Sequence, residues 1–298
     1  MRFIVPTYQR PDSITTPKLL HDVYGVPSNL ITVLVQGGMQ AIEQYTAGGQ
    51  LPVGCEIVDS GAHNAASNRN VGIRMYDGES VIFMDDDITA LSSRKPSIEL
   101  IDDPDPHIGK GVRQRRLTQS GFLSLLQTWS RLLTDTDTQL VTANTTSNSG
   151  FIARFNSGQR FVTNVLLVGQ IMCFRASETS LFDDSLNMTD DVDLGMRLLS
   201  SGITFARDRA VAVYSVNRTK DKPIVPGGIT EFIDQRRQVT DTIVDRYPDL
   251  LRPPRKGSTM PTLKKRQDIL HFDYTSSIVI EDDWFQPSPN DMKGQTGQ

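Results

Sequence analysis

Three consecutive carboxylates, Asp85, Asp86 and Asp87, come directly after the apolar run Val81–Met84. Such a run is typical of a buried strand, and unpaired charges at the end of a buried strand would be costly. Carboxylate oxygens are hard ligands that suit Mg²⁺ or Mn²⁺, which take their remaining ligands from water and substrate phosphates. We therefore expect the triplet to bind one of these ions. The alternative interpretation is a helix N-cap or a surface turn.

A second acidic cluster, made of Asp190, Asp191 and Asp193, begins a helix that we expect at Met188–Ser201. If the fold brings the two clusters together, one can hold a metal ion while the other acts as a base. The alternative is structural, because acids in the first turn of a helix favour its dipole and Thr189 could cap it.

The composition describes an ordinary soluble globular chain of 298 residues, with 38% hydrophobic and 22% charged residues. It excludes disorder, collagen and coiled coil, and it allows one large domain or two small ones. No apolar stretch approaches the ~20 residues of a membrane span, and no signal peptide is evident, so we expect no membrane partner. Cys55 and Cys173 lie far apart in apolar contexts. We interpret them as free buried thiols in a cytoplasmic protein.

The elements that position the first cluster alternate between short β-rich runs and helical stretches, which is typical of a mostly parallel α/β sheet flanked by helices. We expect strands at Arg2–Val5, Leu30–Val35, Glu56–Val58 and Ser80–Met84, and a helix at Ala62–Tyr76. In such a sheet the ligand crevice lies outside the carboxyl ends of the strands.

Polar segments follow each of the four expected strands. They are Pro6-Thr7-Tyr8, Gln36-Gly37-Gly38, Asp59-Ser60-Gly61 and Asp85-Asp86-Asp87. We expect all four segments to converge on one cleft.

The rest of the chain is less regular. The expected elements are helices at Ser120–Leu133 and Ile229–Tyr247, β-structure within Phe151–Phe174, strands at Ile203–Ala206 and Val211–Val216, a charged loop at Asp102–Arg116 and a mobile Thr/Asn/Ser-rich segment at Thr134–Gly150. The final part is rich in proline, then basic, then acidic, and we expect residues 273–298 to form a flexible tail.

Four motifs occur in a fixed order: Phe3–Arg10, Asn68–Ile73, Asp85–Asp87 and Asp190–Leu198. Their order and spacing resemble those of the GT-A fold nucleotide-sugar glycosyltransferases, closest to the inverting family 2. The resemblance implies a Rossmann-like GT-A catalytic domain over residues 1–216. Residues 1–100 would bind the nucleotide sugar and residues 101–216 the acceptor, with a helical and basic extension at 217–272.

The resemblance also implies roles for individual residues. Asp191 would be the catalytic base, and Asp85 and Asp87 would hold Mn²⁺ or Mg²⁺. The donor, a nucleoside-diphosphate sugar and by this likeness a UDP-sugar, would be bound by Pro6, Thr7, Tyr8, Arg10, Gln36, Asp59, Arg69, Asp85 and Asp86. Apart from the resemblance, we expect Asp190 and the basic residues Arg113, Arg115 and Arg116 to meet the acceptor.

The implied chemistry is a single displacement that inverts the anomeric configuration. The metal ion and Arg69 would stabilise the charge that develops on the leaving β-phosphate. Asp191 would deprotonate the attacking hydroxyl.

Two positions depart from the family pattern. Gln36 stands where the family commonly has an aspartate that reads the base, and Asp59 is a possible substitute. The late histidine that often completes the metal site is absent from Val211–Asn217. His271, Asn217 or water could take its place.

Other classes remain open at this point. The segment Asp85–Thr89 also fits the opening motif of haloacid-dehalogenase-like phosphatases, although their nucleophile normally lies near the beginning of the domain. A nucleotidyltransferase would need a glycine-rich, lysine-containing loop, which Pro6–Arg10 does not provide. A non-catalytic binder of nucleotide sugars is the remaining alternative.

Charge gives an indication of the acceptor. The net charge of −4 combines an acidic C-terminal segment with basic runs at 110–116 and 252–266. Basic runs without neighbouring acids can bind polyanions. The chain resembles the small, often phage-encoded glycosyltransferases that modify hydroxymethyl pyrimidines in DNA, so DNA is a candidate partner. An oligosaccharide, protein or small-molecule acceptor is the alternative, and the oligomeric state is open.

Overall fold

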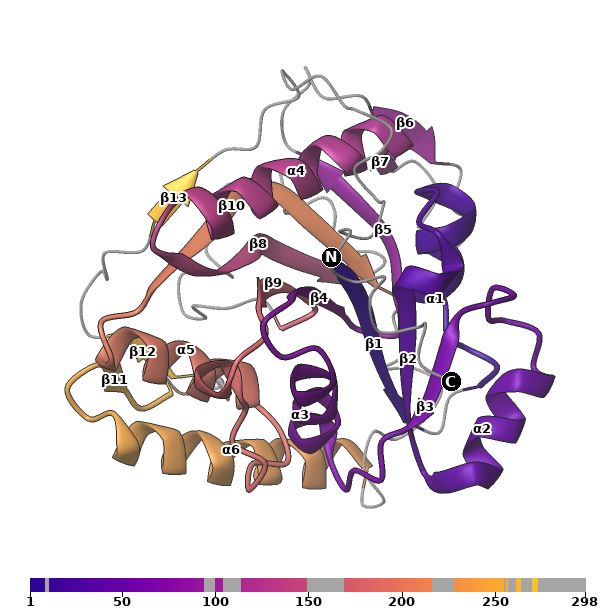
Figure 1. The fold of residues 1–298 in the computed structure, drawn as a ribbon. Coiled ribbons are helices and arrows are strands. Elements are labelled where there is room, and N and C mark those ends of the chain that lie inside the picture. The colour runs from indigo at the N-terminus through magenta and orange to yellow at the C-terminus, as the bar shows by residue number, and fades with distance from the viewer. Residues whose placement is uncertain are drawn as a thin grey trace.

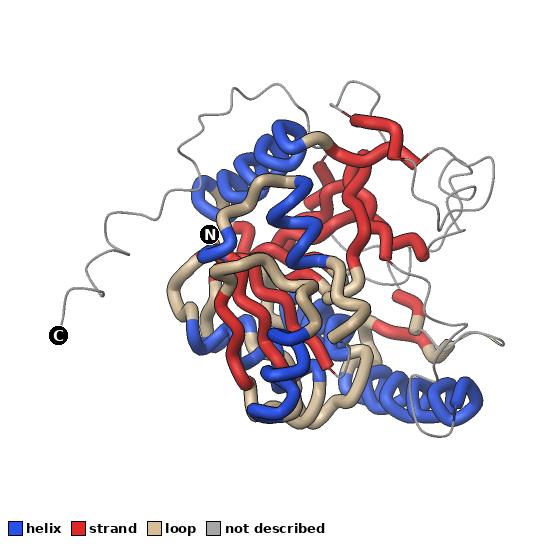
Figure 2. Tube along the Cα trace, turned by 90° about the vertical axis from the view of Figure 1, so that its right-hand side faces the viewer, coloured by secondary structure: helices blue, strands red, loops and turns tan. Residues whose placement is uncertain are grey.

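The computed structural model describes residues 1–8, 11–93, 100–103, 114–148, 169–215, 228–254, 256, 261–263 and 270–272. Helices lie on both faces of a central sheet (Figures 1 and 2). The α-helices are α1 (Thr16–Lys18), α2 (Gly38–Ala47), α3 (Ala65–Met75), α4 (Gln119–Asp135), α5 (Asp190–Ser200) and α6 (Gly228–Arg246). The strands are β1 (Arg2–Tyr8), β2 (Ile31–Gln36), β3 (Glu56–Asp59), β4 (Ser80–Met84), β5 (Ile88–Ser93), β6 (Leu100–Asp103), β7 (Gln114–Leu117), β8 (Thr138–Asn148), β9 (Ile171–Arg175), β10 (Thr204–Ser215), β11 (Leu251–Arg252), β12 (Thr262–Leu263) and β13 (Leu270–Phe272).

Within the described part of the chain, the central sheet has nine strands in the order β13-β10-β8-β9-β4-β1-β2-β3, and β5 pairs with β10. The pairs β1–β2, β1–β4 and β2–β3 are parallel. Strand β10 is parallel to β8 and to β13. Strand β9 is antiparallel to β4 and β8. The sheet is therefore mixed but mostly parallel, as expected.

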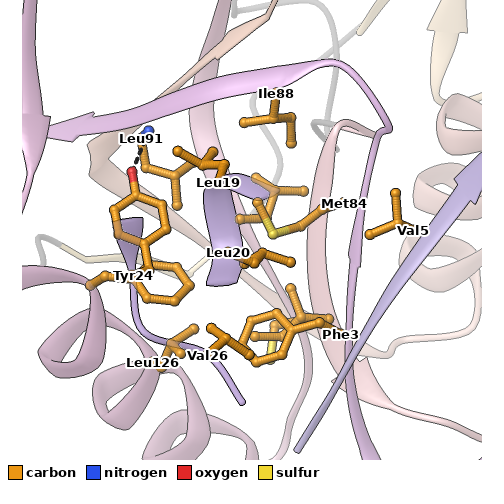
Figure 3. Packing of buried hydrophobic residues seen from close by; sticks show 14 of the residues in the cluster. Phe3, Val5, Leu19, Leu20, Tyr24, Val26, Met84, Ile88, Leu91 and Leu126 are labelled. Atoms are coloured by element: carbon orange, nitrogen blue, oxygen red, sulfur yellow. Dashed lines mark hydrogen bonds between the residues drawn. The ribbon is translucent and has the colours of Figure 1, made fainter. Parts of the chain in front are cut away.

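Alternation along β1 divides the core into two halves. Phe3 and Val5 are buried in a cluster with side chains of α2, of α4 and of the segment Leu19–Val26, whereas Ile4 is buried in a cluster with side chains of α3, α5 and α6. This follows from the period of two in a strand, which sends successive side chains to opposite faces. In the first cluster the rings of Tyr24 and Phe122 stack with their centroids 4.2 Å apart. The Tyr24 hydroxyl accepts a hydrogen bond from the Leu91 backbone N–H at 2.9 Å (Figure 3).

Most of the expected elements are confirmed. Strand β4 has the expected bounds, and β1, β2 and β3 differ from the expected ranges by a few residues at their ends. Helices α3, α4, α5 and α6 occur where the apolar spacing indicates them. In the described part of the chain no helix has both the length and the apolar character needed to span a membrane. Cys55 and Cys173 are both free, but only Cys173 is fully buried.

Three expectations are wrong. The segment Thr134–Gly150, expected to be mobile, contains β8, which pairs with β9 and β10. The ends of the expected loop at Asp102–Arg116 pair as β6 and β7. The two strands expected at Ile203–Ala206 and Val211–Val216 are one strand, β10, with an irregularity between Asp208 and Ala212.

The physical reasons lie in side chains whose polarity hides their strand preference. Thr142 is polar but β-branched, which suits a strand, and its buried hydroxyl donates to the Ile171 carbonyl at 2.9 Å. Asp208 interrupts the apolar pattern of β10, yet its carboxylate is fully buried and accepts a hydrogen bond from Trp129 Nε1 at 3.0 Å.

Candidate active site

The acidic triplet forms a tight turn at the carboxyl end of β4. The Thr15 backbone N–H donates to the Asp86 carbonyl at 2.9 Å, and Thr16 Oγ1 accepts from the Ile88 N–H at 2.9 Å. On the other side, the Asp85 N–H donates to the Gln170 carbonyl at 3.0 Å. The turn is therefore held from both sides, which fixes the direction of its carboxylates.

The three carboxylates have different environments. Asp86 is 6% exposed, and its Oδ2 accepts a hydrogen bond from Thr7 at 2.7 Å. Thr7 also lies 2.7 Å from the Tyr45 hydroxyl, so Asp86 ties the turn to β1 and α2. Asp85 and Asp87 are more accessible than Asp86. Asp85 Oδ1 accepts from Arg69 Nη2 at 3.1 Å.

Helix α3 brings Arg69 to the site, and two neighbouring residues of the Asn68–Ile73 motif hold the helix in place. Asn70 binds the Phe182 backbone twice, donating to its carbonyl at 2.9 Å and accepting from its N–H at 2.7 Å. Gly72 lets the helix approach the sheet closely, since a Cβ there would lie 3.0 Å from side-chain atoms of Ile4 and Leu34. Arg69 can then reach both acidic clusters from one buried position.

Arg69 joins the two clusters. Its Nη1 donates to Asp190 Oδ2 at 2.6 Å, and its Nη2 donates to Asp85 at 3.1 Å. Its guanidinium carbon lies 5.4 Å from the centre of the Phe182 ring. Burial lowers the pKa of Arg69, but the charges of Asp190 and Asp85 outweigh this effect and raise it. The guanidinium therefore stays charged and compensates two carboxylates at once.

The start of α5 is unusual. Thr189, the residue before the helix, has a φ of 57°, the left-handed region that β-branched residues rarely adopt. Its hydroxyl donates to the Met188 carbonyl at 2.6 Å rather than accepting from the helix, so Thr189 does not cap α5 as the structural alternative required. This backbone turn directs Asp190 to Arg69. Such strain persists only where the surrounding contacts over-determine it.

Asp191 is the carboxylate with the clearest sign of a chemical role. Its Oδ1 accepts from the Val192 N–H at 2.9 Å. Burial, followed by the charge of Asp190, raises its pKa to about 6, against the opposing effects of Arg69, the Val192 hydrogen bond and Arg236. A carboxylate with a pKa near the working pH is suited to take up and release a proton.

Asp193 has a structural environment instead. It is 2% exposed and accepts hydrogen bonds from Arg246 at 3.2 Å and from the Tyr247 hydroxyl at 3.3 Å. Arg246 also pairs with Asp183, in the segment that leads into α5. The end of α6 therefore anchors the beginning of α5.

The other expected donor-binding residues lie at the neighbouring strand ends. The β1–β2 register places Tyr8 opposite Gln36, and the β2–β3 register places Val35 opposite Asp59. Tyr8 is 49% exposed and Gln36 is 7% exposed. Asp59 is exposed and accepts from the Gly61 N–H at 3.0 Å. Pro6 lies beside them in β1 and is partly buried. These strand ends therefore lie on the same side of the sheet, and the single cleft that we expected between them stays a prediction.

Of the four expected acceptor residues, only Asp190 and Arg116 have side chains that the structure describes. Asp190 is 6% exposed and is engaged by Arg69. Arg116 is partly buried in β7, which belongs to the separate two-stranded sheet with β6. The backbone of Arg115 pairs with Asp102 in that sheet. Arg10 and Arg113 lie outside the described residues, as does Asn217, and the side chain of His271 is likewise not described.

Asp85 and Asp87 fit a divalent cation that takes its other ligands from water and substrate. Within the described ranges no group of three or more His, Cys, Asp or Glu side chains is placed to hold a metal ion. Asp85 and Asp87 can still supply two carboxylates, and magnesium sites commonly use one or two carboxylates with substrate phosphates and water. Burial and the neighbouring charge of Asp86 raise the pKa of Asp85 even though Arg69 opposes them. Added positive charge would thus be favourable at this turn.

The chain is similar to known proteins in its structure. No family model and no curated protein matches the sequence. A mannosyltransferase from Pyrobaculum calidifontis, solved with GDP-Man and Mn²⁺, is similar with a TM-score of 0.50 and 14% identity, covering 85% of this chain and 65% of that one. The chain has a GT-A fold.

Two further similar structures are glucosyl-3-phosphoglycerate synthases from Mycobacterium tuberculosis. One has a TM-score of 0.46 and 15% identity and covers 86% of this chain and 82% of that one. The other, in complex with Mn²⁺, UDP-Glc and phosphoglyceric acid, has a TM-score of 0.48 and 14% identity and covers 86% of this chain and 81% of that one.

Sequence reasoning missed four residues that shape the site: Asn70, Gly169, Asp183 and Arg246. Asn70 and Arg246 act across long sequence separations, to Phe182 and to Asp183. The role of Gly169 is visible only in the structure, where it lies against Asp191. The one available sequence signal was the Asn68–Ile73 stretch, which contains Asn70 beside Arg69.

Proposed function

We propose that this protein is a glycosyltransferase that moves a sugar from a nucleoside diphosphate to a hydroxyl acceptor and requires a divalent cation. The observation that carries the proposal is the Asp85–Arg69–Asp190 array, which lies next to Asp191 with its raised pKa. An acidic turn suited to a metal and a carboxylate suited to a proton are thereby held beside the carboxyl ends of parallel strands, where ligands bind in such sheets.

Four residues of the site have a proposed part in the reaction. Asp85 and Asp87 would hold Mn²⁺ or Mg²⁺, which would supply charge stabilisation for the leaving diphosphate. Asp191 accepts the proton of the acceptor hydroxyl as that oxygen attacks the anomeric carbon. We propose a single displacement, in which the hydroxyl attacks from the face opposite the leaving diphosphate, so that the anomeric configuration is inverted and no protein nucleophile is needed. Arg69 keeps the two acidic clusters at a fixed separation.

The donor class has separate support from the fold. The mannosyltransferase of similar fold was solved with GDP-Man and Mn²⁺. In this chain Tyr8, Gln36 and Asp59 lie on adjacent strands at the edge where a nucleoside would bind. We propose a UDP-sugar as the donor. Asp59 would bind the base in place of the aspartate that the family commonly has at the position of Gln36.

The metal requirement provides the test. Release of nucleoside diphosphate from a panel of UDP- and GDP-sugars should be supported by Mn²⁺ or Mg²⁺ and should stop in EDTA. Asp87→Asn should raise the Mn²⁺ concentration for half-maximal activity about tenfold or more, because it removes a charged ligand. Asp184→Asn, an exposed carboxylate outside the metal turn, is the matched control.

The phosphatase alternative gives a different outcome in the same experiment. Asp85 would then be a covalent nucleophile. Hydrolysis of a generic phosphate ester that disappears in Asp85→Asn, together with no turnover of any sugar donor, would contradict the transferase proposal. Full turnover in EDTA would contradict the metal assignment alone.

We propose DNA that contains hydroxymethyl pyrimidines as the acceptor, because the basic runs favour a polyanion. Exposed Arg252 and Lys256 belong to one of these runs. Phosphate contacts make binding strongly dependent on salt, with a slope of about 0.9 per contact. Gel-shift titration with duplex DNA at two salt concentrations should therefore show a steep loss of affinity, and neutralising three basic residues of the run should flatten it. Binding that ignores salt, or use of an oligosaccharide instead, would contradict the DNA acceptor and leave the transferase proposal intact.

A further inference from the structure

Gly169, just before β9, lies against the carboxylate of Asp191. A Cβ atom at this position would lie 2.7 Å from Asp191 Oδ2, 3.0 Å from its Cβ and 3.1 Å from its Cγ. Distances below 3.0 Å are too short for carbon and oxygen atoms in van der Waals contact. Since Gly169 does not have a positive φ, its backbone is one that other residues could adopt. The requirement for glycine comes from Asp191.

The two oxygens of Asp191 have different surroundings. Oδ1 is engaged by the Val192 N–H at 2.9 Å. Oδ2 is on the side of Gly169, and within the described residues it accepts no hydrogen bond. Oδ2 is therefore the oxygen that is available to take a proton.

Gly169 also belongs to the segment that fixes the metal turn. The next residue, Gln170, accepts the Asp85 N–H through its carbonyl at 3.0 Å and donates through Nε2 to Ser215 at 3.1 Å. The backbone beside Asp191 is thus tied to both β4 and β10. It cannot easily move away to make room for a side chain.

We propose that Gly169 is a positioning residue for acceptor use, because its missing side chain leaves the Oδ2 face of Asp191 open to the incoming hydroxyl. This role rests on the proposed function. A methyl group at 169 would displace Oδ2 or cover it, so that an acceptor hydroxyl could no longer approach at hydrogen-bond distance. The donor site, which is built from other strand ends, would remain.

The charged groups around Asp191 would be unchanged by this substitution. They are Asp190 on α5, Arg69 on α3 and Arg236 on α6. An added methyl group would only remove water from Oδ2, which disfavours the charged form. The acidic limb of the pH–rate profile should therefore move to higher pH in Gly169→Ala, an effect that a general loss of stability would not produce.

The experiment compares Gly169→Ala with Gly48→Ala, a glycine at the end of α2 whose added Cβ would come no closer than 3.3 Å to another atom. Displacement of a reacting group by about 1 Å can cost 10²-fold in rate. We expect kcat for transfer to fall by about that factor in Gly169→Ala, with an unchanged KM for the donor. Gly48→Ala should transfer at the wild-type rate.

Stability provides a readout that does not depend on activity. Gly169→Ala should lower the urea midpoint of the wild-type protein, and lower it less in an Asp191→Ala background, because two of the three overlapping atoms are then gone. Wild-type transfer rates in Gly169→Ala, or equal losses of stability in both backgrounds, would overturn the role of Gly169. Absence of transfer by the wild-type protein with every donor would overturn the proposed function, and this role with it.

Discussion

Asp191→Asn should lower sugar transfer by a factor of about 10² to 10⁴, because it removes the proton acceptor and keeps the size of the side chain. Binding of nucleoside diphosphate with Mn²⁺, measured by calorimetry, should persist. In the wild-type protein the rate should rise with pH through about 6, where burial and the charge of Asp190 place the pKa of Asp191. In the Asn variant this limb of the profile should be lost.

The control for this variant is its stability. Because the pKa of Asp191 is raised in the folded state, ionisation opposes folding, and the stabilising contribution of the protonated carboxyl is lost as pH rises through about 6. Asp191→Asn should therefore unfold at a urea concentration at least as high as the wild type at pH 8. A parallel loss of donor affinity would instead place Asp191 among the metal or diphosphate ligands.

Arg69→Met should have the largest effect on stability. It leaves the carboxylates of Asp85 and Asp190 without the Nη donors that now lie at 3.1 and 2.6 Å. Removing one partner of a buried ion pair typically costs about 3–5 kcal/mol. Urea unfolding at pH 8 should show a loss of this size, and a smaller one at pH 5, where protonation of carboxyls with raised pKa values relieves the repulsion.

A second substitution makes this prediction specific. In an Asp190→Asn background Arg69→Met should cost less, since one of the two carboxylates is already neutral. Arg69→Lys should give an intermediate loss, because a single ammonium cannot reproduce the two-directional fork of a guanidinium. A loss below about 1 kcal/mol for Arg69→Met, the range of exposed ion pairs, would contradict the buried array.

The elements that could be predicted are those in which the apolar pattern of the sequence agrees with burial in the structure. Strand β4 could be placed to the residue because its four apolar residues are buried and its end is charged. The helix α5 could be placed from its apolar spacing and acidic first turn. In β8, by contrast, burial of Thr142 depends on partners in β9 and β10 that the local sequence does not contain.

The site shows the same division. The residue types at Asp85 and Asp191 indicated their chemistry, but the contact between Arg69 and Asp190 spans 121 residues and depends on the packing of α3 beside α5. Nothing near Gly169 in the sequence indicates that it touches a carboxylate. Contacts of this kind follow from the close approach of backbones, which side-chain patterns do not encode.

The outer side of β10 has a consequence for how the chain acquires its fold. Its first part pairs with β13 at Ala206–Asp208, and its later part pairs with β5 at Val211–Ser215. One strand is thus covered by two segments from opposite regions of the sequence (Figure 1). Pairings this distant slow folding, because loop entropy is lost before contacts form. During synthesis, β10 leaves the ribosome before β13 exists. The backbone hydrogen-bonding groups of Ala206–Asp208, which β13 later covers, are then open to other chains, so aggregation should compete most strongly at that stage.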